Sequence, residues 1–152
     1  MLNQLENSVV SSGTADATAP REPLETTGIV IEAFQKGDIA QVLEHVAEDV
    51  DWEYDSAVDV PWYRARKGKD GAKAFFESLA AVEFLRFDPS TYLGKDDVVV
   101  VIIQGDYRLR SNGRRVVYED GVLLFRYDAE GRIAEFAHRV DLHKAWSAYH
   151  ER

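Results

Sequence analysis

The sequence predicts one α+β domain, in which N-terminal helices pack against a cone-shaped, curved antiparallel sheet. Three observations predict it. Apolar residues recur at helical spacing before residue 47, they recur at strand spacing after residue 83, and short turns separate the predicted strands. A chain of 152 residues is long enough to bury a core within a single domain. A helix-then-strand order places the helices on one face of the sheet.

The first 22 residues are predicted to be a disordered N-terminal arm, and residues 23–152 to be the folded domain. The arm is rich in Ser, Thr, Ala and Asn and has Pro20 near its end, so it offers little apolar surface to bury. A short helix over Leu2 to Val9 is the alternative for part of this segment.

Two helices and a strand are expected next. Apolar residues from Ile29 to Phe34 follow a helical period that ends at Gly37, and Asp38 is a typical N-cap for a second helix extending to Val46. From residue 50 to 55, apolar and acidic residues alternate, which predicts a strand with one apolar and one acidic face. An irregular loop over residues 57–68 and a third helix through Phe75 complete this half.

The second half of the chain predicts a four-stranded meander and a final helix. The expected strands and helix are Phe84 to Leu93, Val98 to Arg110, Arg115 to Tyr127, Arg132 to Val140, and the helix Leu142 to His150. Turn sequences such as Ser111-Asn112-Gly113 lie between the strands and favour antiparallel hairpins. The two central strands are long, so we expect them to bend, with Gly105 and Gly121 as bulge or kink positions.

Charge and composition exclude several classes of function. The chain has 18 basic and 27 acidic residues, a formal net charge of −9, and an acidic protein is repelled by phosphate backbones and anionic lipid. We therefore expect neither a nucleic acid nor a membrane as partner. There is no cysteine, which agrees with a reducing compartment, and we predict a cytoplasmic protein. The sequence lacks a glycine-rich phosphate loop and a His-Glu-x-x-His motif, and we predict no cofactor and no metal site.

The order and spacing of several short segments resemble a known family. They are Gly37-Asp38-Ile39, Trp52-Glu53-Tyr54, the segment from Arg66 to Gly71 that leads into Phe75-Phe76, Asn112-Gly113-Arg114-Arg115-Val116, and the run from Gly131 to Phe136 that continues to Val140-Asp141. Over about residues 24–148 the chain resembles the nuclear transport factor 2-like superfamily, in its SnoaL-like and ketosteroid-isomerase-like branch. The resemblance implies a cystatin-like roll around an apolar pocket, and a homodimer formed through the convex face of the sheet.

The resemblance also points to catalytic positions. Polyketide cyclases of this type and limonene epoxide hydrolase carry a catalytic carboxylate three residues before a terminal aspartate, and here His138 stands three residues before Asp141. Limonene epoxide hydrolase also has an Arg-x-Asp pair on a long strand, where this chain has Gln104-Gly105-Asp106. A histidine beside an aspartate forms a general base that works near neutral pH. We expect His138 and Asp106 to be that pair, unless His138 bonds only within the sheet or at a dimer surface.

Asp120 and Tyr54 are the other candidate catalytic residues. An acid buried among apolar strand residues has a raised pKa and can exchange a proton with a substrate, and a tyrosine can donate a hydrogen bond to it. The alternative for Asp120 is a bulge beside Gly121 that turns Glu119 or Asp120 to solvent.

Aromatic residues predict the wall of a ligand pocket, because ligand sites are mostly apolar with a few placed polar groups. The predicted substrate-binding residues are Trp62, Tyr63, Tyr118, Val122 and Phe136. Trp62 and Tyr63 follow Pro61 on the irregular loop and are expected to act as a lid, whereas Trp52 and Phe76 are expected to belong to the core.

Two functions are consistent with these features. The first is cofactor-free proton transfer, of isomerase or cyclase type, on a small hydrophobic carbonyl compound. The second is a non-catalytic module that binds a small ligand or acts as a dimerisation scaffold on the same fold. Apolar residues on both faces of strands 98–103 and 122–125 favour a homodimer, because a strand that is apolar on both faces needs covering on both.

Overall fold

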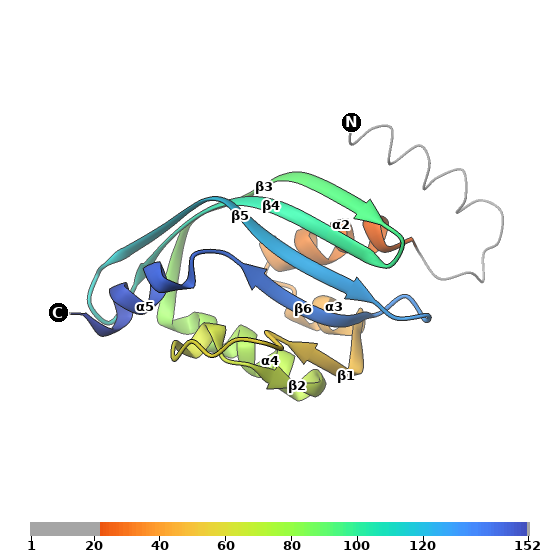
Figure 1. Cartoon of the computed structure of the whole chain (residues 1–152), viewed down its shortest axis with the longest axis horizontal. Helices are drawn as coiled ribbons and strands as arrows, with labels where there is room; N and C mark the ends of the chain where they lie inside the picture. The colour runs from red at the N-terminus through yellow and green to blue at the C-terminus, as the bar shows by residue number, and fades with distance from the viewer. Residues whose placement is uncertain (1–21, 152) are drawn as a thin grey trace.

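The computed structural model describes residues 22–151, so the predicted arm and its alternative helix Leu2 to Val9 lie outside the described residues apart from Glu22. The described part is an α+β fold (Figure 1). Its helices are α2 (Pro23–Gln35), α3 (Ile39–Glu44), α4 (Gly68–Ser78), α5 (Leu142–His150) and the short 3₁₀ helices η1 (Pro61–Tyr63) and η2 (Leu79–Ala81). Its strands are β1 (Val46–Trp52), β2 (Arg66–Lys67), β3 (Val82–Lys95), β4 (Val98–Leu109), β5 (Arg115–Tyr127) and β6 (Ile133–Arg139).

The six strands form one sheet in the order β2-β1-β6-β5-β4-β3. Strands β3 to β6 make the predicted antiparallel meander, and β5 and α5 have the predicted bounds. The pairing of β1 with β6 is parallel, with Trp52 opposite Phe136. This pairing brings an early strand beside the last one, and it places the residues that follow Trp52 next to the C-terminal half of β6.

Local sequence explains how the first two helices are connected. Pro23 stands in the first turn of α2, where a missing N–H costs nothing, and the turn after the helix uses Gly37 at φ 77°. The side chain of Asp38 accepts a hydrogen bond of 3.1 Å from the backbone N–H of Gln41 and caps α3. Val46, which we expected on the second helix, is the first residue of β1, because α3 ends at Glu44.

The predicted bulge between the two long central strands is confirmed. The register shifts between Ile103 and Gly105 on β4, where Gly121 and Tyr118 are their partners on β5, so β5 holds one extra residue. A Cβ atom at Gly121 would lie 2.9 Å from Cγ1 of Val140, a distance that only glycine permits. The bulge bends both strands. It also shifts the alternation of β5 by one residue, so that different alternate side chains face inward before and after it.

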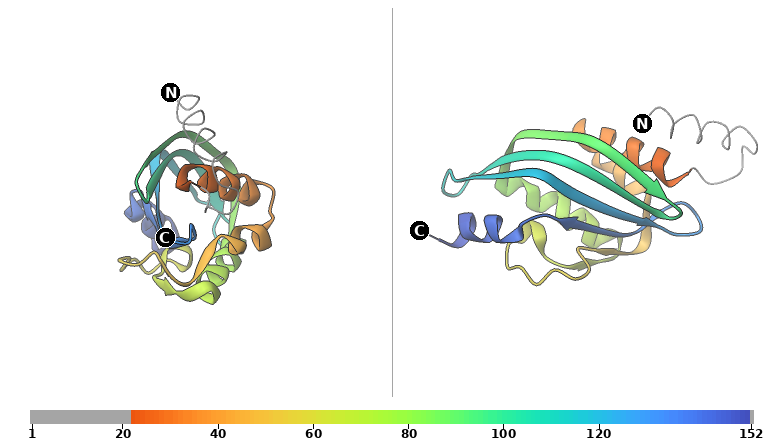
Figure 2. Two further views of the ribbon diagram at one scale, coloured as in Figure 1. Left: turned by 90° about the vertical axis from the view of Figure 1, so that its right-hand side faces the viewer. Right: turned by 45° about the horizontal axis from the view of Figure 1, so that its top comes forward.

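The helices and the sheet enclose the core between them. The view along the long axis in Figure 2 shows the sheet curving round one side and α2, α3 and α4 closing the other. Helix α5 packs beside the turn between β4 and β5, where Nδ2 of Asn112 donates a hydrogen bond of 2.8 Å to the carbonyl of Ala148. None of the helices within residues 22–151 is long and apolar enough to cross a membrane.

Candidate active site

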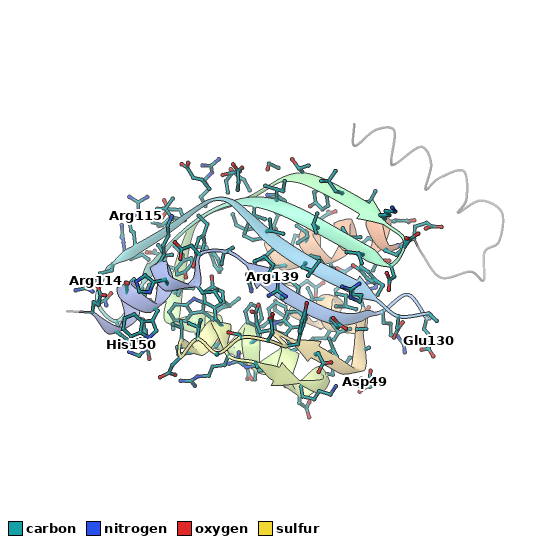
Figure 3. All side chains as sticks on the ribbon, viewed as in Figure 1. Asp49, Arg114, Arg115, Glu130, Arg139 and His150 are labelled. Carbon is teal, nitrogen blue, oxygen red and sulfur yellow. The ribbon has the colours of Figure 1, made fainter. Side chains whose placement is uncertain are left out.

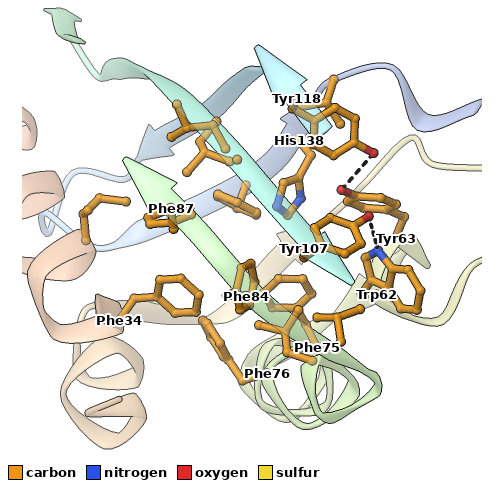
Figure 4. A pocket seen from close by; sticks show the side chains of 18 of the residues that line it. Phe34, Trp62, Tyr63, Phe75, Phe76, Phe84, Phe87, Tyr107, Tyr118 and His138 are labelled. Carbon is orange, nitrogen blue, oxygen red and sulfur yellow. Dashed lines mark hydrogen bonds between the residues drawn. The ribbon is translucent and has the colours of Figure 1, made fainter. Parts of the chain in front are cut away.

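A cavity lies between the concave face of the sheet and the helices (Figure 4). Its free volume is about 80 Å³, and apolar and aromatic side chains make up most of its wall. The aromatic residues and the histidine that line it are Phe34, Trp52, Trp62, Tyr63, Phe75, Phe76, Phe84, Phe87, Tyr107, Tyr118, Phe125, Phe136 and His138. Concave, apolar sites with a few placed polar groups are typical of ligand binding.

His138 is held in this cavity by Glu53, a carboxylate that is only 1% exposed. The backbone N–H of His138 donates a hydrogen bond of 2.8 Å to Oε1 of Glu53, and Nδ1 of the ring bonds to the same oxygen. Because an ionised carboxylate only accepts hydrogen bonds, Nδ1 carries the ring hydrogen. Within residues 22–151, Nε2 of His138 has no hydrogen-bond partner, so it is free to accept a proton.

The backbone at Glu53 explains why its side chain points inward. Strand β1 ends at Trp52, and Glu53 adopts φ 56°, a left-handed conformation that costs a non-glycine residue about 1–2 kcal/mol. This break in the strand places Glu53 beside β6, and its own N–H donates a hydrogen bond of 2.7 Å to the carbonyl of Phe136. The bonds with His138 and Phe136 offset the strain. Strain of this kind is characteristic of functional sites.

Three tyrosines and a tryptophan form the polar part of the cavity wall near His138. The O–H of Tyr63 donates a hydrogen bond of 3.3 Å to the hydroxyl of Tyr118, and Nε1–H of Trp62 donates one of 2.9 Å to the hydroxyl of Tyr107. The Tyr63 ring lies edge-on to the imidazole of His138 at 5.0 Å between centroids. A ring that carries a hydroxyl group thus packs directly against the histidine.

Burial keeps these phenols neutral. Desolvation raises the pKa of Tyr63 and of Tyr118 well above the usual value, and it raises the pKa of Tyr107 as well. A tyrosine that stays protonated keeps its O–H as a hydrogen-bond donor throughout the physiological pH range. The wall can therefore donate to an oxygen atom that gains negative charge.

The expected pairing of His138 with Asp106 is wrong. Ile103, Gly105 and Tyr107 line the cavity from β4, so the alternation of the strand directs Asp106 to the opposite face. There the carboxylate of Asp106 forms an ion pair with Arg115 on β5, and Nε of Arg115 donates to it at 3.1 Å. The carboxylate that holds His138 belongs to Glu53.

Asp120 and Val122 also lie away from the cavity. Asp120 is exposed on the bulge at φ 55°, where its carboxylate accepts a hydrogen bond of 2.8 Å from Nε2 of Gln104. This is the alternative in which the bulge turns the acid to solvent. Beyond the bulge it is Leu123 that lines the cavity, and Val122 stands on the other face of β5, because the extra residue shifts the alternation by one.

Tyr54 is on the surface rather than in the site. It is 37% exposed, its hydroxyl accepts a hydrogen bond of 2.9 Å from Arg139, and the Arg139 guanidinium lies 5.3 Å from its ring centroid. Arg139, the last residue of β6, is labelled near the centre of the view in Figure 3 and is exposed. Tyr54 follows Glu53, so the turn that brings the glutamate inward directs the tyrosine outward.

The other predicted substrate-binding residues line the cavity. Trp62, Tyr63, Tyr118 and Phe136 are all among its lining residues, and Trp62 and Tyr63 are buried parts of the wall rather than an exposed lid. Trp52, which we assigned to the core, also lines the cavity. Within residues 22–151, its Nε1 is the one buried side-chain nitrogen or oxygen that has no hydrogen-bond partner. An acceptor atom of a bound molecule would satisfy it.

Sequence reasoning missed Glu53. We placed it with Asp51 and Asp55 on the acidic face of a strand. A glycine at position 53 would have indicated a left-handed backbone, but a glutamate does not. The pairing of β1 with β6 is the feature that would have revealed it. Within residues 22–151, no group of three or more His, Asp or Glu side chains is placed to hold a metal ion.

Comparison with known proteins identifies the family. The model of the SnoaL-like domain matches residues 30–136. The chain belongs to the SnoaL-like domain family. No protein of curated function matches the sequence.

Solved structures share the fold of this SnoaL-like domain at low identity. An NTF2-like protein from Burkholderia thailandensis has a TM-score of 0.73 at 18% identity, over 85% of this chain and 98% of that one. A candidate SnoaL-like polyketide cyclase from Mesorhizobium loti has a TM-score of 0.61 at 21% identity, over 75% of this chain and 95% of that one. TerC, co-crystallised with polyporic acid, has a TM-score of 0.64 at 20% identity, over 86% and 97%.

Proposed function

We propose that this protein catalyses proton transfer on a small apolar carbonyl compound without a cofactor, and that His138 is the general base. One observation carries the proposal: a buried carboxylate orients the imidazole in an aromatic cavity, and among residues 22–151 Nε2 has no hydrogen-bond partner. A base oriented in this way removes a proton from the carbon beside a carbonyl group. Glu53 is a positioning residue, since it acts through His138.

The tyrosine hydroxyls would stabilise the intermediate. When Nε2 takes the proton, the electron pair of the C–H bond moves to the carbonyl oxygen and forms an enolate. The hydroxyl of Tyr118 accepts from Tyr63, which leaves the O–H of Tyr118 as the protonated donor in the same cavity that would donate to that oxygen. Return of the proton from His138 to a different carbon atom of the enolate completes an isomerisation. In a cyclisation the enolate carbon instead attacks a second carbonyl group of the same substrate and forms a C–C bond, and the proton from His138 goes to the resulting alkoxide oxygen. Both routes regenerate the neutral histidine.

The comparisons support a small hydrophobic ligand. TerC was co-crystallised with polyporic acid, and the Mesorhizobium loti protein carries the name of a polyketide cyclase. Both share this fold at low identity, so their ligand and reaction guide the choice of probe. A location in the cytoplasm stays a prediction that rests on the absence of cysteine.

The test is the exchange of the α-protons of β-tetralone, a bicyclic aromatic ketone, in deuterated water followed by NMR. We expect the protein to accelerate the exchange, and His138→Ala to lower the rate about 10²- to 10⁴-fold. His143→Ala is the matched control, because this histidine lies on α5 and stacks on Trp146 outside the cavity. Binding of β-tetralone by a protein that does not accelerate exchange would refute the enzyme and favour the binding module.

We also propose that the protein is a homodimer formed through the outer face of β4 and β5. Val100, Ile102, Val122 and Leu124 point to this face and remain partly exposed in the single chain. A second copy would cover them. The mass measured by light scattering at micromolar concentration tests this. We expect twice the mass of the chain and a shift to one chain in Leu124→Lys, whereas a single-chain mass for the unmodified protein would rule the dimer out.

A further inference from the structure

An open groove on the surface adjoins the cavity at one end. The groove has a volume of about 460 Å³ and lies where α2, the turn before α3, the end of α4 and β3 meet. Phe34, Phe76, Leu79, Phe84 and Phe87 line both the groove and the cavity. Only side chains therefore separate the two spaces, and those side chains are apolar.

The two ends of the cavity differ in chemistry. Figure 4 shows Phe34, Phe76 and Phe87 on one side, and Tyr63 and Tyr118 with their hydrogen bond on the other. The phenylalanine side is a cluster of rings, in which Phe34 lies 5.2 Å from Phe87 and 6.0 Å from Phe76 between centroids. A molecule that places an oxygen atom against the tyrosines and His138 directs its remaining carbon atoms toward the groove.

The phenylalanine end is the open one. Phe84, which lines both spaces, is 43% exposed, whereas Trp62 and Tyr63 at the tyrosine end are 2% and 3% exposed. At the tyrosine end the wall is also covered from outside, since Tyr149 of α5 packs edge-on against Trp62 at 5.7 Å between centroids. Access from solvent is thus easiest past the phenylalanines.

The small size of the cavity also indicates that a ligand extends into the groove. Its free volume of about 80 Å³ is far below the roughly 300–1,000 Å³ of ordinary ligand pockets. A carbonyl group and a few carbon atoms fit in such a space. The rest of a larger molecule needs additional room, and the adjoining groove offers it along an apolar path.

We propose that the groove binds the apolar tail of the substrate, so that the site takes an elongated ketone whose carbonyl head enters first, past Phe34 and Phe84, and stops against His138. The inference rests on the proposed function for the position of the head. It adds the shape of the substrate, its direction of entrance and a binding surface outside the catalytic cavity.

The test is the affinity for a series of methyl ketones, from methyl propyl ketone to methyl nonyl ketone, followed by the fluorescence of the cavity tryptophans. We expect the dissociation constant to fall about fourfold with each added methylene group, because each one is transferred from water to an apolar surface. This trend should extend past the chain length that the cavity alone can hold. Affinity that stops improving at the shortest ketones would overturn the proposal.

A pair of variants on α3 localises the effect. Ile39 lines the groove and not the cavity, and its neighbour Ala40 lines neither and is exposed. Both stand in the first turn of α3, where a glutamate suits the helix dipole. We expect Ile39→Glu to weaken the binding of methyl nonyl ketone roughly tenfold, because the new carboxylate would lose bound water when the tail lies beside it. The same variant should leave methyl propyl ketone unchanged, and Ala40→Glu should leave both unchanged.

Each outcome separates the groove from the catalytic proposal. Equal weakening of the long and the short ketone by Ile39→Glu, or no weakening of either, would reject the groove even if α-proton exchange is fast. Chain-length dependence without α-proton exchange would support the groove and reject the enzyme. Binding of no ketone would reject both. Ile39→Ala, which adds no charge, serves as a second variant if thermal denaturation shows that Ile39→Glu is unfolded, and we expect it to weaken only the long ketone.

Discussion

Replacing Glu53 by glutamine changes the charge that holds His138 and little else. One oxygen of Glu53 accepts from both the backbone N–H and Nδ1 of His138, in a place that is 1% exposed. A hydrogen bond to a charged group contributes about 1.5–3 kcal/mol, and one between neutral groups about 0.5–1.5 kcal/mol. The amide of Glu53→Gln can keep neutral bonds only. We expect the free energy of unfolding to fall by about 2 kcal/mol.

The matched control is Asp51→Asn. Asp51 lies on β1, two residues before Glu53, and its carboxylate pairs with Lys67 at 2.9 Å, but both side chains are well exposed. An exposed ion pair contributes at most about 1 kcal/mol and commonly less. We expect Asp51→Asn to stay within about 0.5 kcal/mol of the unmodified protein. The difference between the two variants isolates burial, because the chemical change is the same.

Urea and thermal denaturation measure these changes in the free energy of unfolding. A loss of about 2 kcal/mol lowers the melting temperature of a domain of this size by about 4–8 °C. In the exchange of β-tetralone α-protons, Glu53→Gln should lower the rate about 10²-fold, since the imidazole loses its orientation, while the affinity for the ketone stays the same. A Glu53→Gln protein that is as stable as Asp51→Asn and exchanges at the full rate would refute the positioning role.

Three further predictions concern the sheet and the tyrosines. Asp106→Asn and Asp120→Asn should each leave α-proton exchange unchanged, because both carboxylates face away from the cavity; a loss above about tenfold would contradict this placement. Burial raises the pKa of Tyr63 and Tyr118 in the folded protein. The contribution of these two tyrosines to the free energy of unfolding should therefore be constant below about pH 10, where unfolded tyrosine ionises, and should decrease as pH rises above it. Phenolate absorbance of Tyr63, obtained as the difference between the unmodified protein and Tyr63→Phe, that appears before circular dichroism is lost would disagree. Gly121→Ala should cost about 1–3 kcal/mol by urea denaturation, because its Cβ would meet Val140, and an unchanged midpoint would show that the bulge can relax.

The sequence predicted the class of fold and most of its elements, because their ends are marked locally. Asn112-Gly113 and the segment from Asp128 to Gly131 set the ends of β5, so its bounds are those predicted. The cap at Asp38 placed the start of α3 in the same way. Trp62 and Tyr63, which we expected as a lid, are buried residues that line the cavity, and their contact with a substrate stays a prediction.

The orientation of the polar residues could not be predicted in the same way. One extra residue at the bulge reverses which side chains of β5 face inward, and this shift carried Asp120 and Val122 to the other face. Asp106 was assigned from its chemical type and from the resemblance of Gln104-Gly105-Asp106 to an Arg-x-Asp pair, without knowledge of which alternate residues of β4 face the cavity. Glu53 depends on a left-handed backbone at a residue other than glycine, which tertiary contacts impose and the local sequence does not announce.

The parallel pairing of β1 with β6 makes the site a late product of folding. Glu53 and His138 are 85 residues apart in the chain, and the contact between them closes a loop that contains α4 and the whole of β3, β4 and β5. Contacts of such separation form after the local helices and hairpins, because chain entropy must be lost before they bring any gain. During synthesis the imidazole has no carboxylate to orient it until β6 has been added to the sheet. The hydrogen bonds between Glu53 and His138 would thus form only in chains whose sheet includes β6.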